Sequence, residues 1–117
     1  MRIAIVGSRF RTCKDEVFKA VAELEEGDVV VSGGAKGVDS WAAEAAMDRG
    51  LTVVVFTVKD IREQMNYVAK LMARNTLIAK DCDRVIAFPQ HQVDPGHGGT
   101  WDTVRKARKM GKPVDIR

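Results

Sequence analysis

The sequence predicts an α/β fold in which a doubly wound, five-stranded parallel sheet carries helices on both faces. Short apolar runs such as residues 3–6 and 29–31 have the composition of strands buried on both sides. Segments with helical spacing of apolar residues separate these runs, and glycines mark many of the boundaries. This alternation of strands and helices predicts that neighbouring strands are parallel and are joined by right-handed crossovers. It favours the strand order 3-2-1-4-5.

The first half of the chain contains two strands, each followed by a helix. Residues 3–6 form an uninterrupted apolar run that ends at Gly7. A helix is expected over residues 14–25, because apolar side chains recur there at helical spacing: Val17, Phe18, Val21 and Leu24. The second strand is the valine run 29–31, and the alanine-rich helix after it ends at Gly50.

The second half repeats the same alternation. Residues 52–57 are β-branched almost throughout and form the third strand. The segment 60–80 is helix-rich, and residues 84–88 form the fourth strand. The last helix covers residues 100–110, and residues 113–116 supply a short fifth strand.

The length and composition of the chain predict a single domain over residues 1–117. The apolar fraction of 45% and the charged fraction of 30% are ordinary for a globular protein. No apolar run approaches the ~20 residues that span a bilayer, and no signal peptide is recognisable, so a cytoplasmic location is expected. The net charge of +3 permits an anionic ligand without demanding nucleic acid. Cys13 and Cys82 lack metal-ligand spacing and are expected to be free thiols.

Two glycine-rich turns each connect a strand to a helix. The first contains Gly33 and Gly34, and the second contains Gly98, Gly99 and Thr100. In an open parallel sheet, ligands bind outside the carboxyl ends of the strands, where both turns lie. Exposed N–H groups at the positive ends of two helices suit a phosphate group. The sequence therefore predicts a site for a phosphorylated ligand at this edge.

Common nucleotide and metal motifs are absent. Lys36 precedes Gly37 instead of following it, so the Walker pattern fails, and Trp101 occupies the place of the last glycine in the dinucleotide pattern. His91 and His97 have no patterned third ligand, and loop residues or ligand contacts are the simpler interpretation. We expect no cofactor and no metal.

The order of several short motifs resembles the SLOG superfamily of Rossmann-like domains, in its small stand-alone branch. The motifs are Gly7-Ser8-Arg9, Gly33-Gly34-Ala35-Lys36-Gly37-Val38-Asp39, Arg74-Asn75 and Gly98-Gly99-Thr100. The superfamily includes the lonely-guy phosphoribohydrolases and the DNA-processing protein A family. The resemblance covers nearly the whole chain, and it implies a nucleotide or nucleotide-derived ligand and a homodimer.

The resemblance also implies roles for individual residues. Ligand-binding positions are those of the turns and their polar neighbours: Gly7, Ser8, Arg9, Gly33, Gly34, Asp39, Asn75, Gly98, Gly99 and Thr100. Arg74 matches the arginine that holds the substrate and supports catalysis in the lonely-guy enzymes. For Asp39, the residues themselves leave two roles open, namely a bond to a ribose hydroxyl or a bond to backbone donors of its own helix.

One departure from the lonely-guy pattern concerns catalysis. Those enzymes carry a glutamate at the position of Thr103, and a threonine replaces a carboxylate poorly in glycosidic cleavage. The adjacent Asp102 is a candidate catalytic acid, or a first-turn acid that complements the helix dipole.

Arg74 poses a geometric problem. A straight helix from residue 60 would carry it ~21 Å along the axis, about a strand length, and away from the ligand. We therefore predict that the 60–80 segment breaks near residues 71–74 and that a new helix begins close to Asn75.

The leading interpretation is a protein that binds a nucleotide or nucleotide-derived phosphate ester through the two glycine turns. An alternative is a nucleoside-monophosphate N-glycosidase of lonely-guy type, in which Arg74 orients the phosphosugar and Asp102 or Asp39 is the acid. A weaker alternative is a single-stranded nucleic-acid module. The basic residues from Arg105 to Arg117 either serve that module or form a solvated helix face. No membrane partner is expected.

Overall fold

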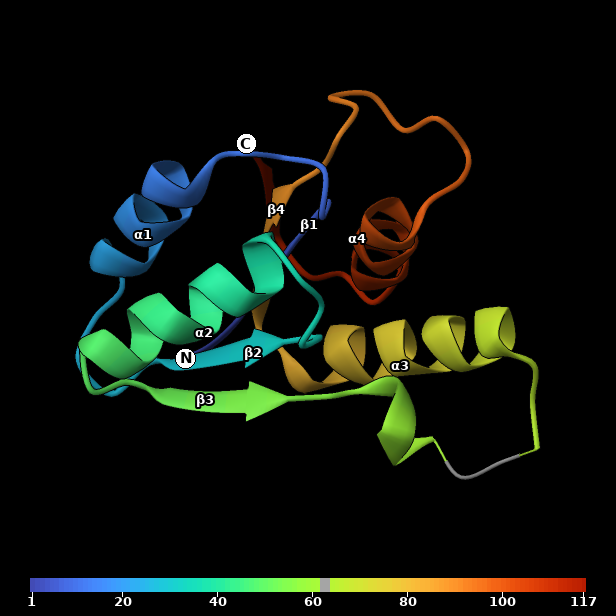
Figure 1. Ribbon diagram of the computed structural model, residues 1–117, viewed down its shortest axis with the longest axis horizontal. Helices are drawn as coiled ribbons and strands as arrows, with labels where there is room; N and C mark the ends of the chain where they lie inside the picture. Colours follow the sequence, from blue (N-terminus) through green and yellow to red (C-terminus); the bar gives the residue numbers. More distant parts are fainter. Residues whose placement is uncertain (62–63) are drawn as a thin grey trace.

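The computed structural model describes residues 1–61 and 64–117, and it confirms the predicted architecture (Figure 1). A five-stranded parallel sheet has the order β3-β2-β1-β4-β5. The strands are β1 (Arg2–Gly7), β2 (Val29–Ser32), β3 (Thr52–Val55), β4 (Arg84–Phe88) and β5 (Val114–Ile116). The helices are α1 (Lys14–Ala22), α2 (Val38–Asp48), α3 (Tyr67–Asp81) and α4 (Gly99–Lys109), with a short 3-10 helix η1 (Val58–Asp60). In the described ranges, none of these helices has both the length and the apolar character needed to cross a bilayer.

The sheet separates two apolar layers. Ile3 and Ile5 of β1 face α1 and α2, whereas Ala4 and Val6 face α3 and α4. This division follows from strand geometry, since successive side chains point to opposite faces. Burial on both faces explains why the central strands are continuous apolar runs in the sequence.

The register brings the carboxyl ends of the central strands together. Gly7 at the end of β1 pairs with Phe88 at the end of β4, and the N–H of Ser8 donates to the carbonyl of Phe88 at 3.0 Å. On the other side of β1, the strand β2 ends at Ser32, beside Val55 of β3. The loops after β1, β2 and β4 therefore leave the sheet at one common edge.

The predicted helix over residues 60–80 differs from the structure. η1 ends at Asp60, residues 62 and 63 lie outside the described residues, and α3 begins only at Tyr67. The side chain of Asn66 sets this start, because its Oδ1 accepts a hydrogen bond from the N–H of Ala69 at 2.8 Å.

The predicted break near residues 71–74 is wrong, because α3 runs unbroken to Asp81. Arg74 nevertheless stays at the carboxyl edge of the sheet. It lies seven residues into α3, or about 10 Å at 1.5 Å per residue. Figure 1 shows that the first half of α3 extends beyond the ends of β2 and β3. The late start of the helix, rather than a break inside it, keeps Arg74 near the glycine turns.

Candidate functional site

A cavity of about 410 Å³ opens at the carboxyl edge of the sheet, between the loops after β1, β2 and β4 and the first turns of α3 and α4. This volume lies within the usual range of small-molecule sites. Most of the predicted site residues line it: Gly7, Ser8, Arg9, Asp39, Arg74, Asn75, Gly98, Gly99 and Thr100. Gly33 and Gly34 line an adjoining hollow instead, and Asp102 lines neither.

The first turn of α4 forms one wall of the cavity. Its N-cap is Gly98, which has a φ of 94° and no side chain that can cap the helix. The N–H groups at the start of a helix lack partners within that helix, and they lie at the positive end of its dipole. Gly99 and the half-exposed Thr100 line the cavity beside Gly98. This wall therefore offers backbone donors and positive potential to an anion.

The loop after β1 forms another part of the cavity wall. A Cβ atom at Gly7 would come within 2.7 Å of Val38, so only glycine lets the first turn of α2 pack this closely against β1. The Oγ of Ser8 accepts a hydrogen bond from the N–H of Phe10 at 3.1 Å. The guanidinium of Arg9 lies 5.1 Å from the centre of the exposed Phe10 ring. This wall presents a cation and an exposed aromatic side chain.

Arg74 crosses from α3 to the turn after β2. Its Nη1 donates to the carbonyl of Gly33 at 2.6 Å, and its Nε donates to Oδ1 of Asn75 at 3.0 Å. A Cβ at residue 33 would lie 2.7 Å from this Nη1 and 2.9 Å from Oδ2 of Asp39. Because Gly33 has no side chain, the guanidinium of Arg74 and the carboxylate of Asp39 can both lie against its backbone.

Asp39 is a buried carboxylate on the floor of the cavity, with 5% of its surface exposed. Its Oδ2 accepts a hydrogen bond from the N–H of Ala35 at 3.2 Å. Burial raises the pKa of Asp39 from 3.8 to about 6, and the opposing effects of the Ala35 N–H and the Arg74 guanidinium are smaller. Within the described ranges, no group donates a hydrogen bond to its other oxygen, Oδ1.

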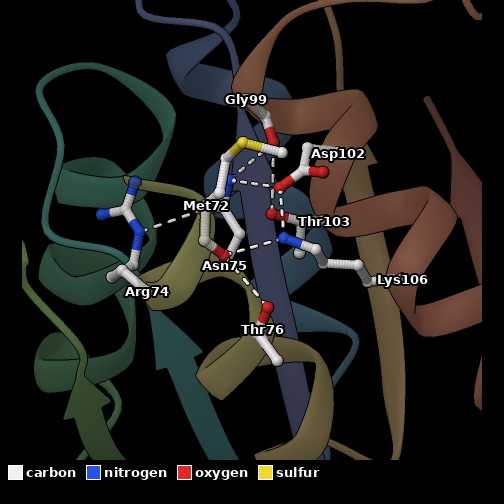
Figure 2. A network of polar contacts seen from close by, with 8 residues as sticks. All are labelled: Met72, Arg74, Asn75, Thr76, Gly99, Asp102, Thr103 and Lys106. Atoms are coloured by element: carbon white, nitrogen blue, oxygen red, sulfur yellow. Dashed lines mark hydrogen bonds and ion pairs between the residues drawn. The ribbon is translucent and has the colours of Figure 1, made fainter. Parts of the chain in front are cut away.

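Asp102 belongs to a network that joins α3 to α4 (Figure 2). Its Oδ2 accepts hydrogen bonds from Nδ2 of Asn75 at 3.1 Å and from Nζ of Lys106 at 2.8 Å. The same amide nitrogen of Asn75 also donates to the carbonyl of Gly99 at 3.3 Å. Figure 2 shows Asn75 between Arg74 on one side and Asp102 with Lys106 on the other. Asn75 therefore orients both Arg74 and the start of α4, whereas Asp102 holds the two helices together.

The adjoining hollow lies across Arg74 from the main cavity. Its volume is about 580 Å³, and Tyr67, Leu71 and Arg74 line both spaces. Lys59 and Lys70 add positive charge to the hollow. Together the two spaces make a basic edge that extends from the turn after β2 to the start of α4.

The loop before α4 lines the cavity and is held by contacts with α4. The indole N–H of Trp101 donates to the carbonyl of His91 at 2.9 Å, and Arg105 forms an ion pair with Asp94 at 2.7 Å. The rings of His91 and His97 are 6.4 Å apart in an edge-to-face arrangement. Among residues 1–61 and 64–117, no group of three potential metal ligands comes together.

Much of the basic C-terminal stretch interacts within the chain. Lys106 pairs with Asp102, and Arg117 pairs with Glu23 and Asp115. Lys112 donates hydrogen bonds to carbonyl groups near the end of α3. These three cations therefore contribute to the packing of the domain, whereas Arg108 and Lys109 are exposed on the same stretch.

Two exposed aromatic side chains at the cavity were not predicted as site residues. Phe10 is 66% exposed and Tyr67 is 68% exposed, and both line the cavity. Phe10 directly follows the Gly7-Ser8-Arg9 motif, so its position in the sequence was an available signal. For Tyr67, only the start of α3 places the ring at the site.

A family model identifies the family of this chain, and a solved structure shares its fold. The family model of the DNA recombination-mediator protein A matches residues 1–81. Among solved structures, DNA processing protein A from Streptococcus pneumoniae superposes with a TM-score of 0.78 and 24% sequence identity. The match covers 98% of this chain and 49% of the pneumococcal one, so this chain spans about half the length of that protein. A comparison with curated proteins gave no match.

Proposed function

Because this chain belongs to the DNA recombination-mediator protein A family, we propose that it binds a nucleotide or a nucleotide-derived phosphate ester at the carboxyl edge of its sheet. The observation that carries the proposal is the start of α4, where an N-cap without a side chain opens into the same cavity as Arg9 and Arg74. The resemblance to SLOG domains supports the same class of ligand.

The phosphate group belongs at the α4 wall. Backbone N–H groups there have fixed positions, so they bind an anion without losing side-chain entropy. Arg9 is exposed, lines the same cavity and adds a mobile positive charge. Charge-assisted hydrogen bonds from guanidinium groups to phosphate are about twice as strong as neutral ones.

The base belongs at the rim, where Phe10 and Tyr67 expose their rings. Stacking on an aromatic side chain contributes about 1–3 kcal/mol per base and tolerates every base. The proposed ligand therefore extends from a polar, positively polarised wall to an aromatic rim.

Titration calorimetry with adenosine monophosphate (AMP) and the other nucleoside monophosphates tests the proposal. We expect saturable binding that Arg9→Ala weakens by about 10-fold, because one phosphate contact is lost. Lys36→Ala is the matched control, since Lys36 is exposed on the turn after β2 and lines neither cavity. Absence of binding by every nucleotide, or equal losses in both variants, would contradict the proposal.

A strand of single-stranded DNA is the second candidate ligand. The exposed Phe10 and Tyr67 rings beside Arg9 favour it, because such grooves combine cations with aromatic platforms. Fluorescence anisotropy with oligothymidylates of increasing length separates the two candidates. A strand-binding site gains affinity with length and loses it steeply with salt, whereas a mononucleotide site does neither to the same degree.

Turnover is tested in the same samples. Release of free base from a nucleoside monophosphate would identify the chain as an N-glycosidase of lonely-guy type. Thr103 stands at the position of the lonely-guy glutamate, and Asp102 is engaged by Lys106. Both features favour binding without turnover. We therefore expect no free base by chromatography after prolonged incubation.

A further inference from the structure

The hollow that adjoins the main cavity carries positive charge beyond the proposed phosphate contacts. Its volume is about 580 Å³, and three cations line its described walls, namely Lys59 from η1 with Lys70 and Arg74 from α3. None of the described residues that line the hollow is acidic. No ion pair among the described residues includes either lysine. The hollow therefore holds uncompensated positive charge beside the proposed nucleotide site.

The spacing of residues along α3 brings two of these cations to one face of the helix. Tyr67, Lys70, Leu71 and Arg74 recur at positions i, i+3, i+4 and i+7, and all four line the hollow. Lys70 and Arg74 are four positions apart, where like charges destabilise a helix. The first turn of α3 contains no acidic residue, and the helix dipole adds positive potential there. This arrangement is unfavourable in the free chain, and a bound anion would offset it.

We infer that the hollow binds a second phosphate group, and that the ligand is a nucleotide whose two phosphates are separated by its sugar. This inference rests on the proposed function and names the ligand class within it. A lysine ammonium group suits the role, because it binds phosphate as a compact point charge on a flexible stem. A phosphate monoester carries close to two negative charges at neutral pH, so it matches a cluster of cations better than a singly charged diester does.

The strand order sets the separation of the two phosphate positions. The turn after β4 leads into the α4 wall of the main cavity, whereas the turn after β2 borders the hollow. Because β1 lies between β2 and β4, the two turns are two strand spacings apart, or roughly 10 Å. The phosphates of a diphosphate share a bridging oxygen, so they lie too close together for this separation. Phosphates on opposite sides of a ribose lie farther apart, and the long side chains of Lys59 and Lys70 can shorten the remaining distance.

Arg74 lies at the boundary between the two spaces and lines both of them. Its Nη1 donates to the carbonyl of Gly33 and its Nε donates to Asn75, so the guanidinium is held from two sides. In the described part of the chain, no hydrogen bond uses its Nη2. A guanidinium fixed in this way keeps donors for phosphate and loses little entropy when it binds. The sugar therefore belongs beside Arg74, between the two phosphates.

Titration calorimetry with AMP, ADP and adenosine 3′,5′-bisphosphate tests the inference. We expect the wild-type chain to bind the bisphosphate about 10-fold more tightly than AMP, the value of one charge-assisted hydrogen bond. ADP should gain much less, because its second phosphate stays beside the first. Lys59→Ala and Lys70→Ala should each lower the preference for the bisphosphate to about 3-fold, and the double variant should nearly remove it. Lys80→Ala is the matched control and should keep the full preference, since Lys80 is an exposed lysine on the same helix and lines neither space.

The 5′-phosphorylated dinucleotide pApA distinguishes a monoester from the diester of a nucleic-acid strand. It carries the same adenosine 5′-phosphate as AMP, but its second phosphate is linked to another adenosine. The ratio of wild-type to Lys70→Ala affinities isolates the contribution of the hollow from contacts of the second base. We expect this ratio to be smaller for pApA than for the bisphosphate, because the diester has less charge.

Several outcomes would overturn the inference. Equal binding of AMP and the bisphosphate would reject it while the proposed nucleotide function stands. A preference for the bisphosphate that survives in the double lysine variant would place the second phosphate outside the hollow. An equal or larger lysine-dependent gain for pApA would assign the hollow to a nucleic-acid strand. No binding of any nucleotide would reject both this inference and the proposed function.

Discussion

At the scale of the single residue, the buried carboxylate of Asp39 lowers the stability of the fold at neutral pH, and the same side chain lines the cavity. Its pKa is raised in the folded chain, from 3.8 to about 6, by burial. The folded state therefore binds this proton more tightly than the unfolded state does. The contribution of Asp39 to the free energy of unfolding is therefore most favourable below about pH 4, and this contribution is lost as the pH rises through about 6.

Asp39→Asn is accordingly expected to stabilise the free protein at pH 7. The neutral amide removes a desolvation cost of roughly 2–3 kcal/mol and keeps an oxygen for the N–H of Ala35. Urea denaturation at several pH values measures this effect, and the difference between the two proteins should shrink towards pH 4. A destabilised variant at pH 7 would mean that the charge itself is required by the fold.

Gly33 is the second residue at which a small change has a specific consequence. In Gly33→Ala, the new Cβ would occupy the space of Arg74 Nη1, and this flexible side chain is the easiest group to displace. We expect a loss of stability of about 1 kcal/mol and a loss of AMP affinity comparable to that of Arg74→Ala. The double variant should lose little more than either single variant, because both act through the same guanidinium. Additive losses would show that Gly33 acts separately.

At the scale of the element, α3 and α4 determine where the site residues lie. The N-cap of α3 decides where that helix begins, and Tyr67 and Arg74 follow from it. The network around Asn75 then fixes α3 against the start of α4. The same two helices therefore supply the wall at which we propose that the phosphate binds, together with Tyr67 of the rim and Arg74.

Replacement of Asn66 tests whether its side chain caps the start of α3. Asn66→Ala removes the acceptor for the N–H of Ala69 and should lower the free energy of unfolding by about 1 kcal/mol. Asn66→Ser, which retains a capping oxygen, should lose much less. Thermal and urea denaturation followed by circular dichroism measure both variants. Equal losses in the two variants would contradict the capping role.

Replacement of Asp102 tests whether that carboxylate is structural. Asp102→Ala leaves Nδ2 of Asn75 and Nζ of Lys106 without their shared acceptor, and it should cost about 1–3 kcal/mol of stability. Because Asp102 does not line the cavity, the affinity for AMP should change little at a temperature where the variant is folded. Unchanged stability with lost affinity would instead assign Asp102 to the ligand.

At the scale of the whole molecule, we expect residues 1–117 to unfold as one domain. The two tryptophans test whether the two sides of the sheet unfold together. Trp41 packs against the core layer of α1 and α2, and Trp101 lies in the layer of α3 and α4. In Trp41→Phe and Trp101→Phe, the remaining indole reports on one layer only. We expect each fluorescence midpoint in urea to coincide with the circular dichroism midpoint of the same variant. Separate transitions would divide the chain into two units.

The association state belongs to the same scale. The homodimer implied by the family resemblance stays a prediction, and light scattering tests it directly. A dimer would have twice the chain mass of 12.9 kDa.

The sequence by itself determined the fold class, the strand order and the edge at which the glycine turns meet. These features follow from local patterns, because buried parallel strands must be apolar and crossovers must be right-handed. The family resemblance also came from short motifs in a fixed order, and the family model confirmed it.

Only the tertiary structure decided which side chains reach the cavity. Arg74 lies there because α3 begins at Tyr67 and extends beyond the sheet, which periodicity could not reveal. Asp102 and Asp39 are both first-turn acids in the sequence, yet one is paired with a lysine and the other is buried with an oxygen unpaired. Their difference depends on the neighbouring elements, since the partners of a side chain come from segments far away along the chain.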